Sequence, residues 1–159
     1  MSRNVDSGED LRELYRELIL DHARNPRHFG KLPEATHSAE GINPLCGDKL
    51  KLYLRIGDGD TIDDACFEGS GCAISVASAS LLTDTVIGMR TGAALGFFEA
   101  LVQRLSTGAE SGRPAIDLGK LRALEGVKEF PARVKCATLA WHALNSAILD
   151  ERTPATTEQ

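Results

Sequence analysis

The stretch Gly69-Ser70-Gly71-Cys72-Ala73-Ile74-Ser75 decides how this chain folds, because it joins two segments of different periodicity. The residues before it alternate in the manner of a strand, and residues 72–88 are small and apolar, as in a closely packed helix. The glycines predict a tight turn between the two elements. Cys72 is therefore expected at a helix N-terminus, where unpaired N–H groups and the helix dipole stabilise a thiolate.

Two further cysteines stand in comparable places. Cys46 lies in Asn43-Pro44-Leu45-Cys46-Gly47-Asp48, a loop-like segment that also carries a carboxylate. Cys136 follows Pro131, a typical first-turn residue, and is also expected at a helix start. Three thiolates and one carboxylate can complete a tetrahedral zinc shell. We expect four residues to share one site: Cys46, Asp48, Cys72 and Cys136.

Spacing alone does not establish this site, because the pattern matches no simple zinc-finger motif. The alternative is that Cys72 and Cys136 are small buried residues, as free cysteines often are. The residues by themselves leave both interpretations open.

The composition indicates one domain without disulfides. The chain has 159 residues, 42% of them hydrophobic and 26% charged, with a net charge of -5. It has no basic stretch with interleaved aromatics, no apolar run of about 18 residues, and no signal-peptide core. We therefore expect a cytoplasmic protein with no nucleic-acid or membrane partner. Its four cysteines then indicate metal or thiol chemistry.

The remaining pattern predicts an α+β fold. Strict alternation predicts a strand over 49–56, a turn at 57–60, a returning strand over 61–68, and room for a short edge strand before Cys46. The expected helices cover residues 7–25, 72–88, 91–105, 117–124 and 131–149. A flexible loop is expected at 106–114, and Asp117 is expected to cap the helix that follows.

We expect a single compact domain over residues 1–159, with flexible tails at 1–8 and 152–159. Its core is a small antiparallel sheet of about three strands, covered by helices.

Three motifs resemble those of the IscU/NifU-like iron–sulfur assembly proteins. They are Cys46-Gly47-Asp48, the Gly69–Ser75 stretch, and Arg133-Val134-Lys135-Cys136-Ala137-Thr138-Leu139-Ala140-Trp141. Leu20-Asp21-His22 with Asn25-Pro26-Arg27 also resembles the opening segment of that family. The resemblance covers roughly residues 10–150.

Within the family, the chain is most similar to the SufU group. Lys135 stands where the scaffold members carry histidine. An extra stretch within 92–129 also separates the second and third cysteine motifs. Both departures favour the SufU group over the IscU scaffolds.

The SufU resemblance implies a zinc-bound sulfur acceptor that works with a pyridoxal-phosphate-dependent cysteine desulfurase of the SufS type and supplies a downstream iron–sulfur scaffold. It implies Cys46, Asp48, Cys72 and Cys136 as the zinc ligands, and a compact α+β fold. Such a protein is a sulfurtransferase-like carrier that stimulates its partner, which leaves open whether it counts as an enzyme. The alternatives are a scaffold that assembles a [2Fe–2S] cluster on the same ligands, and a structural zinc domain that serves as an interaction module.

Cys46 is the thiol that we expect to accept sulfur. A thiolate held by zinc is a weakened nucleophile, so one ligand has to leave before it reacts. Cys72 and Cys136 are expected to be anchored on helices, whereas Pro44 and Gly47 place Cys46 in a loop that can swing.

Cys66 and His142 have competing interpretations. Cys66 is expected to be a strand residue without a metal role, although it could displace Asp48 as a ligand. His142 lies six residues after Cys136, which places its side chain about 120° away on a helix. A solvated polar face is therefore expected to comprise Lys135, Thr138, His142 and Asn145.

Four charged or titratable residues near the motifs have weaker signals. His22 is expected to cap the first helix or to form an interface, and His28 lies in a loop; neither is expected to bind zinc. Arg133 and Lys135 flank Cys136 and are expected to offset the negative charge of the site.

Overall fold

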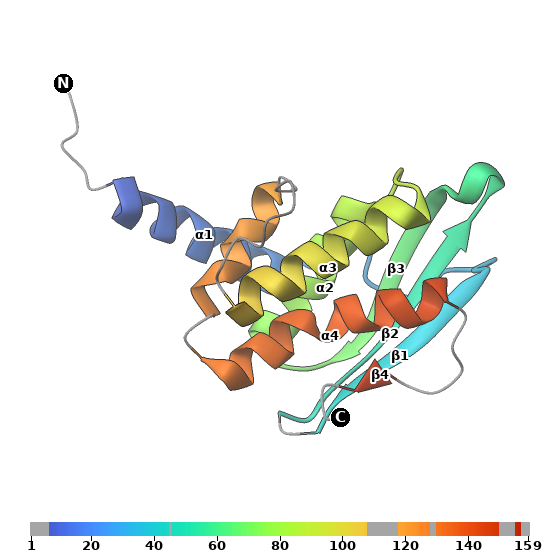
Figure 1. Ribbon diagram of the computed structural model, residues 1–159. Coiled ribbons are helices and arrows are strands. Elements are labelled where there is room, and N and C mark those ends of the chain that lie inside the picture. Colours follow the sequence, from blue (N-terminus) through green and yellow to red (C-terminus); the bar gives the residue numbers. More distant parts are fainter. Residues whose placement is uncertain (1–6, 45, 108–117, 128–129, 150–154, 157–159) are drawn as a thin grey trace.

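The structure, a computed structural model, describes residues 7–44, 46–107, 118–127, 130–149 and 155–156. A mixed sheet carries helices on one of its faces (Figure 1). The elements in chain order are α1 (Ser7–Arg24), β1 (His37–Asn43), β2 (Asp48–Ile56), the 3-10 turn η1 (Asp58–Asp60), β3 (Ile62–Ser70), α2 (Ala73–Val86), α3 (Thr91–Thr107), the 3-10 segment η2 (Gly119–Val127), α4 (Pro131–Ile148) and β4 (Ala155–Thr156).

The sheet has the strand order β3-β2-β1-β4. Three antiparallel strands were expected, and β1, β2 and β3 confirm them. The fourth strand, β4, is two residues long and runs parallel to β1. The tail expected at 152–159 therefore contains a strand at 155–156, and the tail expected at 1–8 overlaps α1 at residues 7 and 8. The other residues of both expected tails lie outside the described part of the chain.

The alternation in β2 separates the two faces of the sheet. Leu50, Leu52 and Leu54 are buried beneath the helices, and the residues between them are partly exposed. Ala65 and Phe67 of β3 lie on the same buried face. The packing of this face places the Asn43 end of β1 and the Asp48 end of β2 under α4.

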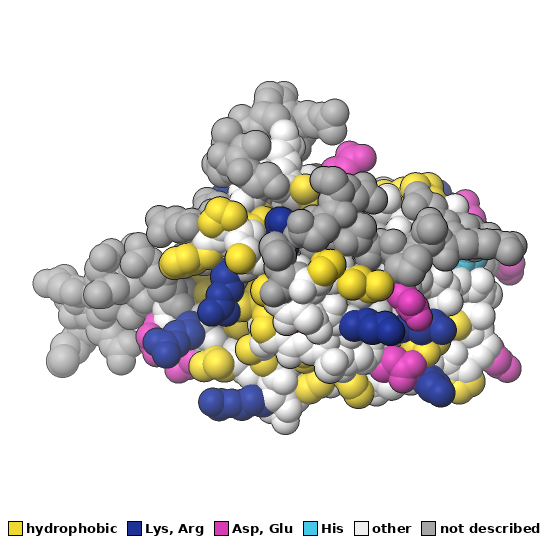
Figure 2. Space-filling model, turned by 90° about the horizontal axis from the view of Figure 1, so that it is seen from below, with side chains coloured by type: hydrophobic (Ala, Val, Ile, Leu, Met, Phe, Trp, Pro, Cys, Tyr) yellow, Lys and Arg dark blue, Asp and Glu magenta, His cyan; other side chains and the backbone are white. Residues whose placement is uncertain are grey.

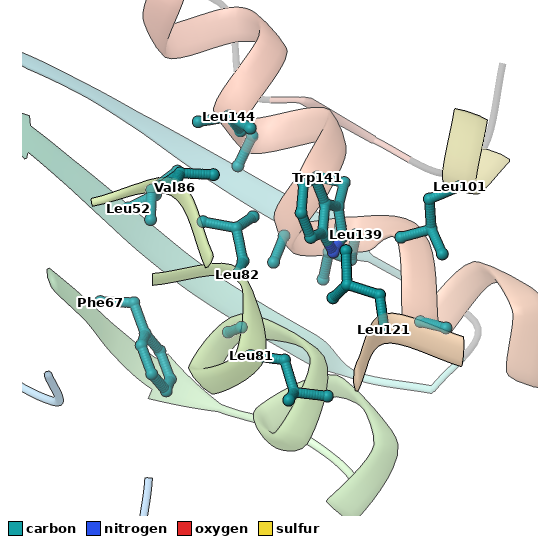
Figure 3. Packing of buried hydrophobic residues seen from close by; sticks show 14 of the residues in the cluster. Leu52, Phe67, Leu81, Leu82, Val86, Leu101, Leu121, Leu139, Trp141 and Leu144 are labelled. Carbon is teal, nitrogen blue, oxygen red and sulfur yellow. The ribbon is translucent and has the colours of Figure 1, made fainter. Parts of the chain in front are cut away.

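Helices α2 and α4 form the centre of the core. Small residues make up much of α2, which allows α4 to pack closely on it. Buried side chains of both helices fill the space above the sheet, with Trp141 of α4 fully buried (Figure 3). This packing fixes α4 relative to the strand ends that carry the candidate site.

The structure adjusts two of the predicted helices. Helix α3 extends to Thr107, and the remainder of the loop expected at 106–114 lies outside the described residues. The helix expected at 117–124 is a 3-10 segment over Gly119–Val127, and its expected cap, Asp117, is also outside the described residues.

The surface seen from below the view of Figure 1 is mixed in character. Lysine and arginine side chains lie there in small separate groups, with acidic and hydrophobic side chains between them (Figure 2). Among the described residues, no helix combines the length and the apolar character needed to cross a membrane.

Candidate metal centre

Two thiols and one carboxylate converge at one end of the sheet. The ligand atoms of Cys46, Asp48 and Cys136 all lie within 4.8 Å of one another. The β1–β2 turn supplies Cys46, the first residue of β2 supplies Asp48, and α4 supplies Cys136. These elements meet at the same end of the sheet in Figure 1. Sulfur and carboxylate oxygen are ligands that zinc accepts, so the chemistry of this donor set fits that metal.

The three side chains differ strongly in exposure. Cys46 is exposed, whereas Asp48 and Cys136 are each 1% exposed. The Cys136 thiol nevertheless donates to the sulfur of Cys46 across 3.4 Å. The site therefore joins one thiol at the surface to two buried groups.

Asp48 is held from two sides. Its Oδ2 accepts a hydrogen bond from Asn43 Nδ2 at 3.1 Å. Its Oδ1 accepts a hydrogen bond from the backbone N–H of Cys72 at 2.8 Å. The carboxylate thus connects the β1–β2 hairpin to the junction between β3 and α2.

Two glycines allow this junction to approach Asp48. A Cβ on Gly71 would lie 2.7 Å from Asp48 Oδ1, which is closer than real Cβ atoms come to another heavy atom. Gly69 has φ of 139°, and a Cβ there would lie 2.2 Å from the carbonyl oxygen of Lys49. The Gly-rich turn is therefore required both by backbone conformation and by close packing.

Cys72 is the N-cap residue of α2, as the sequence predicts. Its sulfur accepts a hydrogen bond from the Ser75 N–H at 3.5 Å. Cys72 is not in the group of three described above, but it borders that group. Its backbone N–H donates to Asp48, and its thiol contributes to raising the pKa of Cys136. Three of the four predicted ligands are thus gathered, with the fourth adjacent to them.

The expectation that Cys136 lies at a helix start is wrong. Helix α4 begins at Pro131, so Cys136 is its sixth residue and lies beyond the first turn, where the dipole effect fades. Burial raises the pKa of the Cys136 thiol far above its ordinary value, and hydrogen bonds with Asp48, Cys46 and Cys72 raise it further. A cation bound here would reverse this effect, because metal coordination favours the thiolate.

Cys66 lies outside the group of three. It is opposite Tyr53 in the β2–β3 register and alternates with the buried residues Ala65 and Phe67. Burial raises the pKa of its thiol, and the carboxylate of Asp64 raises it further. It is therefore a strand residue, as expected.

The solvated polar face predicted around His142 is confirmed only in part, because Lys135, His142 and Asn145 are partly exposed and Thr138 is buried. The imidazole of His142 lies 5.2 Å from the Phe98 ring of α3, at an interplanar angle of 76°. Burial lowers the pKa of His142, and Thr138 on the same face is only 5% exposed. Phe98 of α3 therefore packs against this face, and helical periodicity within α4 alone does not reveal such a neighbour.

His22 and His28 both contact hydroxyl groups of α2. His22 is 2% exposed, and its Nδ1 lies 2.7 Å from Ser80 Oγ. His28 Nδ1 lies 3.3 Å from Thr83 Oγ1. His22 is thus a buried contact between α1 and α2 in the last turn of α1.

The two basic residues that flank Cys136 differ in exposure. Arg133 is exposed, and Lys135 is partly buried. Their predicted role in offsetting the charge of the site remains a prediction.

Sequence reasoning missed Asn43, which contacts two of the predicted ligands. Its Nδ2 lies 3.5 Å from Cys136 Sγ in addition to its bond to Asp48. Its position could have indicated its contact with Asp48, because the last residue of a strand before a hairpin loop lies opposite the first residue of the returning strand.

Comparison with known proteins identifies the family. Residues 14–151 match the NifU-like N-terminal domain. The chain belongs to this family. The family resemblance predicted from the three cysteine motifs is thus confirmed. The match over residues 14–151 is close to the predicted span of residues 10–150.

Two relatives of this NifU-like chain have different names. It is 43% identical over 142 residues to the zinc-dependent sulfurtransferase SufU of Bacillus subtilis. This match covers 89% of this chain and 94% of the relative. It is 42% identical over 138 residues to the iron–sulfur cluster assembly scaffold protein IscU of Thermotoga maritima. That match covers 85% of this chain and 92% of the relative. The first relative is named for zinc-dependent sulfur transfer, and the second for iron–sulfur cluster assembly.

Solved structures of related proteins have the same fold. FiSufU of Fervidobacterium islandicum, described as an iron–sulfur cluster assembly scaffold for the SUF system, matches with a TM-score of 0.74 at 35% identity. The match covers 83% of this chain and 94% of that one. A NifU-like protein from Brucella abortus has a TM-score of 0.76 at 24% identity, which supports the fold alone. The predicted α+β architecture is therefore confirmed.

Proposed function

We propose that this protein is a zinc-dependent sulfur acceptor for iron–sulfur cluster biogenesis, with Cys46 as the acceptor thiol. The observation that carries the proposal is the difference in exposure within the candidate metal centre. Cys46 is exposed, while the neighbouring Asp48 and Cys136 are 1% exposed. Such an arrangement provides fixed ligands together with one thiol that a partner can reach.

Zinc suits the donor set of this site. We propose Cys46, Asp48, Cys72 and Cys136 as its ligands, a tetrahedral set of three sulfurs and one oxygen. Zinc has no redox chemistry and, when bound, would hold the thiols in their deprotonated form. The Bacillus subtilis relative, 43% identical to this chain, is named as zinc-dependent, which agrees with this choice.

The proposed chemistry is transfer of one sulfur atom between thiols. The Cys46 thiolate attacks the outer sulfur of a persulfide on the donor cysteine, and a new S–S bond forms on Cys46. The S–S bond of the donor breaks at the same time, and the donor cysteine leaves as a thiolate. No external oxidant or reductant is needed.

The buried residues keep the site assembled during this transfer. Asp48 is fixed by hydrogen bonds from Asn43 and from the backbone of Cys72. Cys136 is anchored on α4, which packs on both β1 and β2. Cys46 can therefore leave the group while the others keep their positions.

The proposed sulfur donor is a pyridoxal-phosphate-dependent cysteine desulfurase of the SufS type, and the proposed recipient is a downstream iron–sulfur scaffold. The name of the sulfurtransferase relative supports a partnership of this kind. The cytoplasmic location expected from the sequence belongs to this proposal.

The alternative function is a scaffold on which a [2Fe–2S] cluster is assembled. The identity to relatives named as IscU scaffolds favours it, at 42% for Thermotoga maritima and 40% for Streptococcus pyogenes. Thiolates also suit iron–sulfur ligation. A protein that is purified with iron and sulfide would favour this alternative.

The test measures zinc content and sulfur acceptance separately in Cys46→Ser and in a matched control, Cys66→Ser. Both substitutions replace one thiol by a hydroxyl, but Cys66 is on β3 outside the group of three. We expect Cys46→Ser to abolish sulfur acceptance from a desulfurase while part of the zinc is retained. Cys66→Ser is expected to behave as the wild type. Sulfur acceptance by Cys46→Ser would overturn the assignment of the acceptor.

A further inference from the structure

Asn43 lies at the base of the loop that carries Cys46. It is the last residue of β1, directly opposite Asp48, the first residue of β2. Its side chain is 0% exposed. The loop that contains Cys46 therefore begins at Asn43 and ends at Asp48, and both of these side chains are buried under the helices.

The carboxamide of Asn43 bridges two predicted ligands from different parts of the chain. Its Nδ2 lies 3.1 Å from Asp48 Oδ2 and 3.5 Å from Cys136 Sγ. A carboxamide nitrogen carries two hydrogens, so one can be donated to each ligand. The opposite orientation of the amide would place its oxygen against the Asp48 carboxylate, which can only accept hydrogen bonds.

These contacts matter because carboxylate and thiolate, the forms in which Asp and Cys bind a metal, are both anionic. Hydrogen bonds to charged acceptors are about twice as strong as neutral ones. Neither acceptor has access to much water, since Asp48 and Cys136 are each 1% exposed. Donors supplied by the protein must therefore replace the missing hydration.

We propose that Asn43 is a positioning residue, which holds Asp48 and Cys136 in fixed relation so that they retain the metal while Cys46 accepts sulfur. This inference rests on the proposed function. The β1–β2 hairpin then has two roles. Its buried strand ends, Asn43 and Asp48, fix the ligands, and Cys46 between them carries the reacting thiol.

The test compares the zinc affinity of the full chain with that of Asn43→Leu and Asn43→Asp, by competition with a chelator. Leucine is close in size to asparagine but has no donor, and aspartate replaces the donors by a negative charge. Loss of a residue that supports metal ligands typically lowers metal affinity about 10- to 100-fold. We expect a loss in this range for Asn43→Leu and a larger loss for Asn43→Asp.

A control distinguishes positioning from general stability. Ser80 is also fully buried and hydrogen-bonded, but it accepts from the Arg27 N–H and contacts His22 at the α1–α2 interface. Ser80→Ala is expected to lower the melting temperature of the metal-free protein without changing its zinc affinity. Replacement of zinc by cobalt supplies a second readout, because the thiolate-to-cobalt absorption of Asn43→Leu is expected to shift from that of the wild type.

If Asn43→Leu does not fold, Asn43→Ser retains one donor and is expected to lose less affinity than Asn43→Asp. Zinc binding by the wild type together with unchanged affinity and cobalt spectrum in Asn43→Leu would overturn this inference and leave the proposed function standing. A wild-type protein that binds no zinc would overturn both.

Discussion

A single methyl group added at Gly71 should displace Asp48. A Cβ at this position would lie 2.7 Å from Asp48 Oδ1 and 3.1 Å from its Cγ, and the three nearest heavy atoms all belong to Asp48. Ordinary contacts begin at 3.4 Å, so the carboxylate must move by roughly 0.7 Å. Gly71 does not have a left-handed backbone, so Gly71→Ala acts through this contact.

The movement of Asp48 should weaken its bond to the Cys72 N–H. That bond is 2.8 Å long, and a shift of about 0.7 Å takes it beyond the usual range of N–H···O distances. Hydrogen bonds to charged groups contribute about 1.5–3 kcal/mol, and overpacking costs about 1–3 kcal/mol. We expect Gly71→Ala to lower the free energy of unfolding by about 2 kcal/mol, which corresponds to about 4–8 °C in melting temperature.

Calorimetry and zinc competition measure the two consequences of Gly71→Ala. Zinc affinity is expected to fall at least about 10-fold, because a predicted ligand is displaced. Gly126→Ala is the matched control, because a Cβ at Gly126 has no heavy atom within 4 Å. If Gly71→Ala keeps both the melting temperature and the zinc affinity of the wild type, the reasoning about the packing of Asp48 is refuted.

Three further predictions concern the stability of the fold. Gly69→Ala should lower the free energy of unfolding, measured with urea, by about 3 kcal/mol or more. The added Cβ would lie against the Lys49 carbonyl oxygen, and the backbone at this position has φ of 139°, which only glycine adopts easily. A smaller loss would contradict the rigidity inferred for this junction. Burial lowers the pKa of His22, so the unfolded chain takes up a proton that the folded chain resists, and stability should fall as the pH drops below about 6.5. His22→Gln should flatten this dependence in thermal unfolding from pH 7 to 5, and an unchanged pH profile would contradict it. Trp141→Ala should lower the free energy of unfolding, followed by circular dichroism, by about 3–5 kcal/mol. Trp141→Phe should lower it clearly less, because the indole N–H that it removes has no partner among the described residues. Equal losses for the two variants would contradict this prediction.

Features that depend on residues close together in the sequence were predicted correctly. The alternation of Leu50, Leu52 and Leu54 predicted the buried face of β2, because side chains in a strand alternate wherever one face is covered. The Gly-rich turn predicted Cys72 at the start of α2, because both the turn and the cap are short-range features. The motifs that carried the family resemblance also lie within short segments.

Features that depend on packing between distant segments were missed or wrong. Pro131 marked the start of α4, but the burial of Cys136 arises from the packing of that helix on the sheet. The Asn43 contact with Cys136 joins residues that are 93 positions apart. The contact of His142 with the ring of Phe98, on another helix, cannot be inferred from the periodicity of α4. The short strand β4 depends on pairing with β1, and its two residues have no pattern of their own.

The most direct test of the central claim is to locate the persulfide after sulfur transfer. The wild-type protein is incubated with a cysteine desulfurase and cysteine, and the modified peptide is identified by mass spectrometry. The exposed position of Cys46 beside two buried groups predicts the added sulfur on Cys46, with Cys72 and Cys136 unmodified. A persulfide on Cys72 or Cys136, with Cys46 unmodified, would contradict the account.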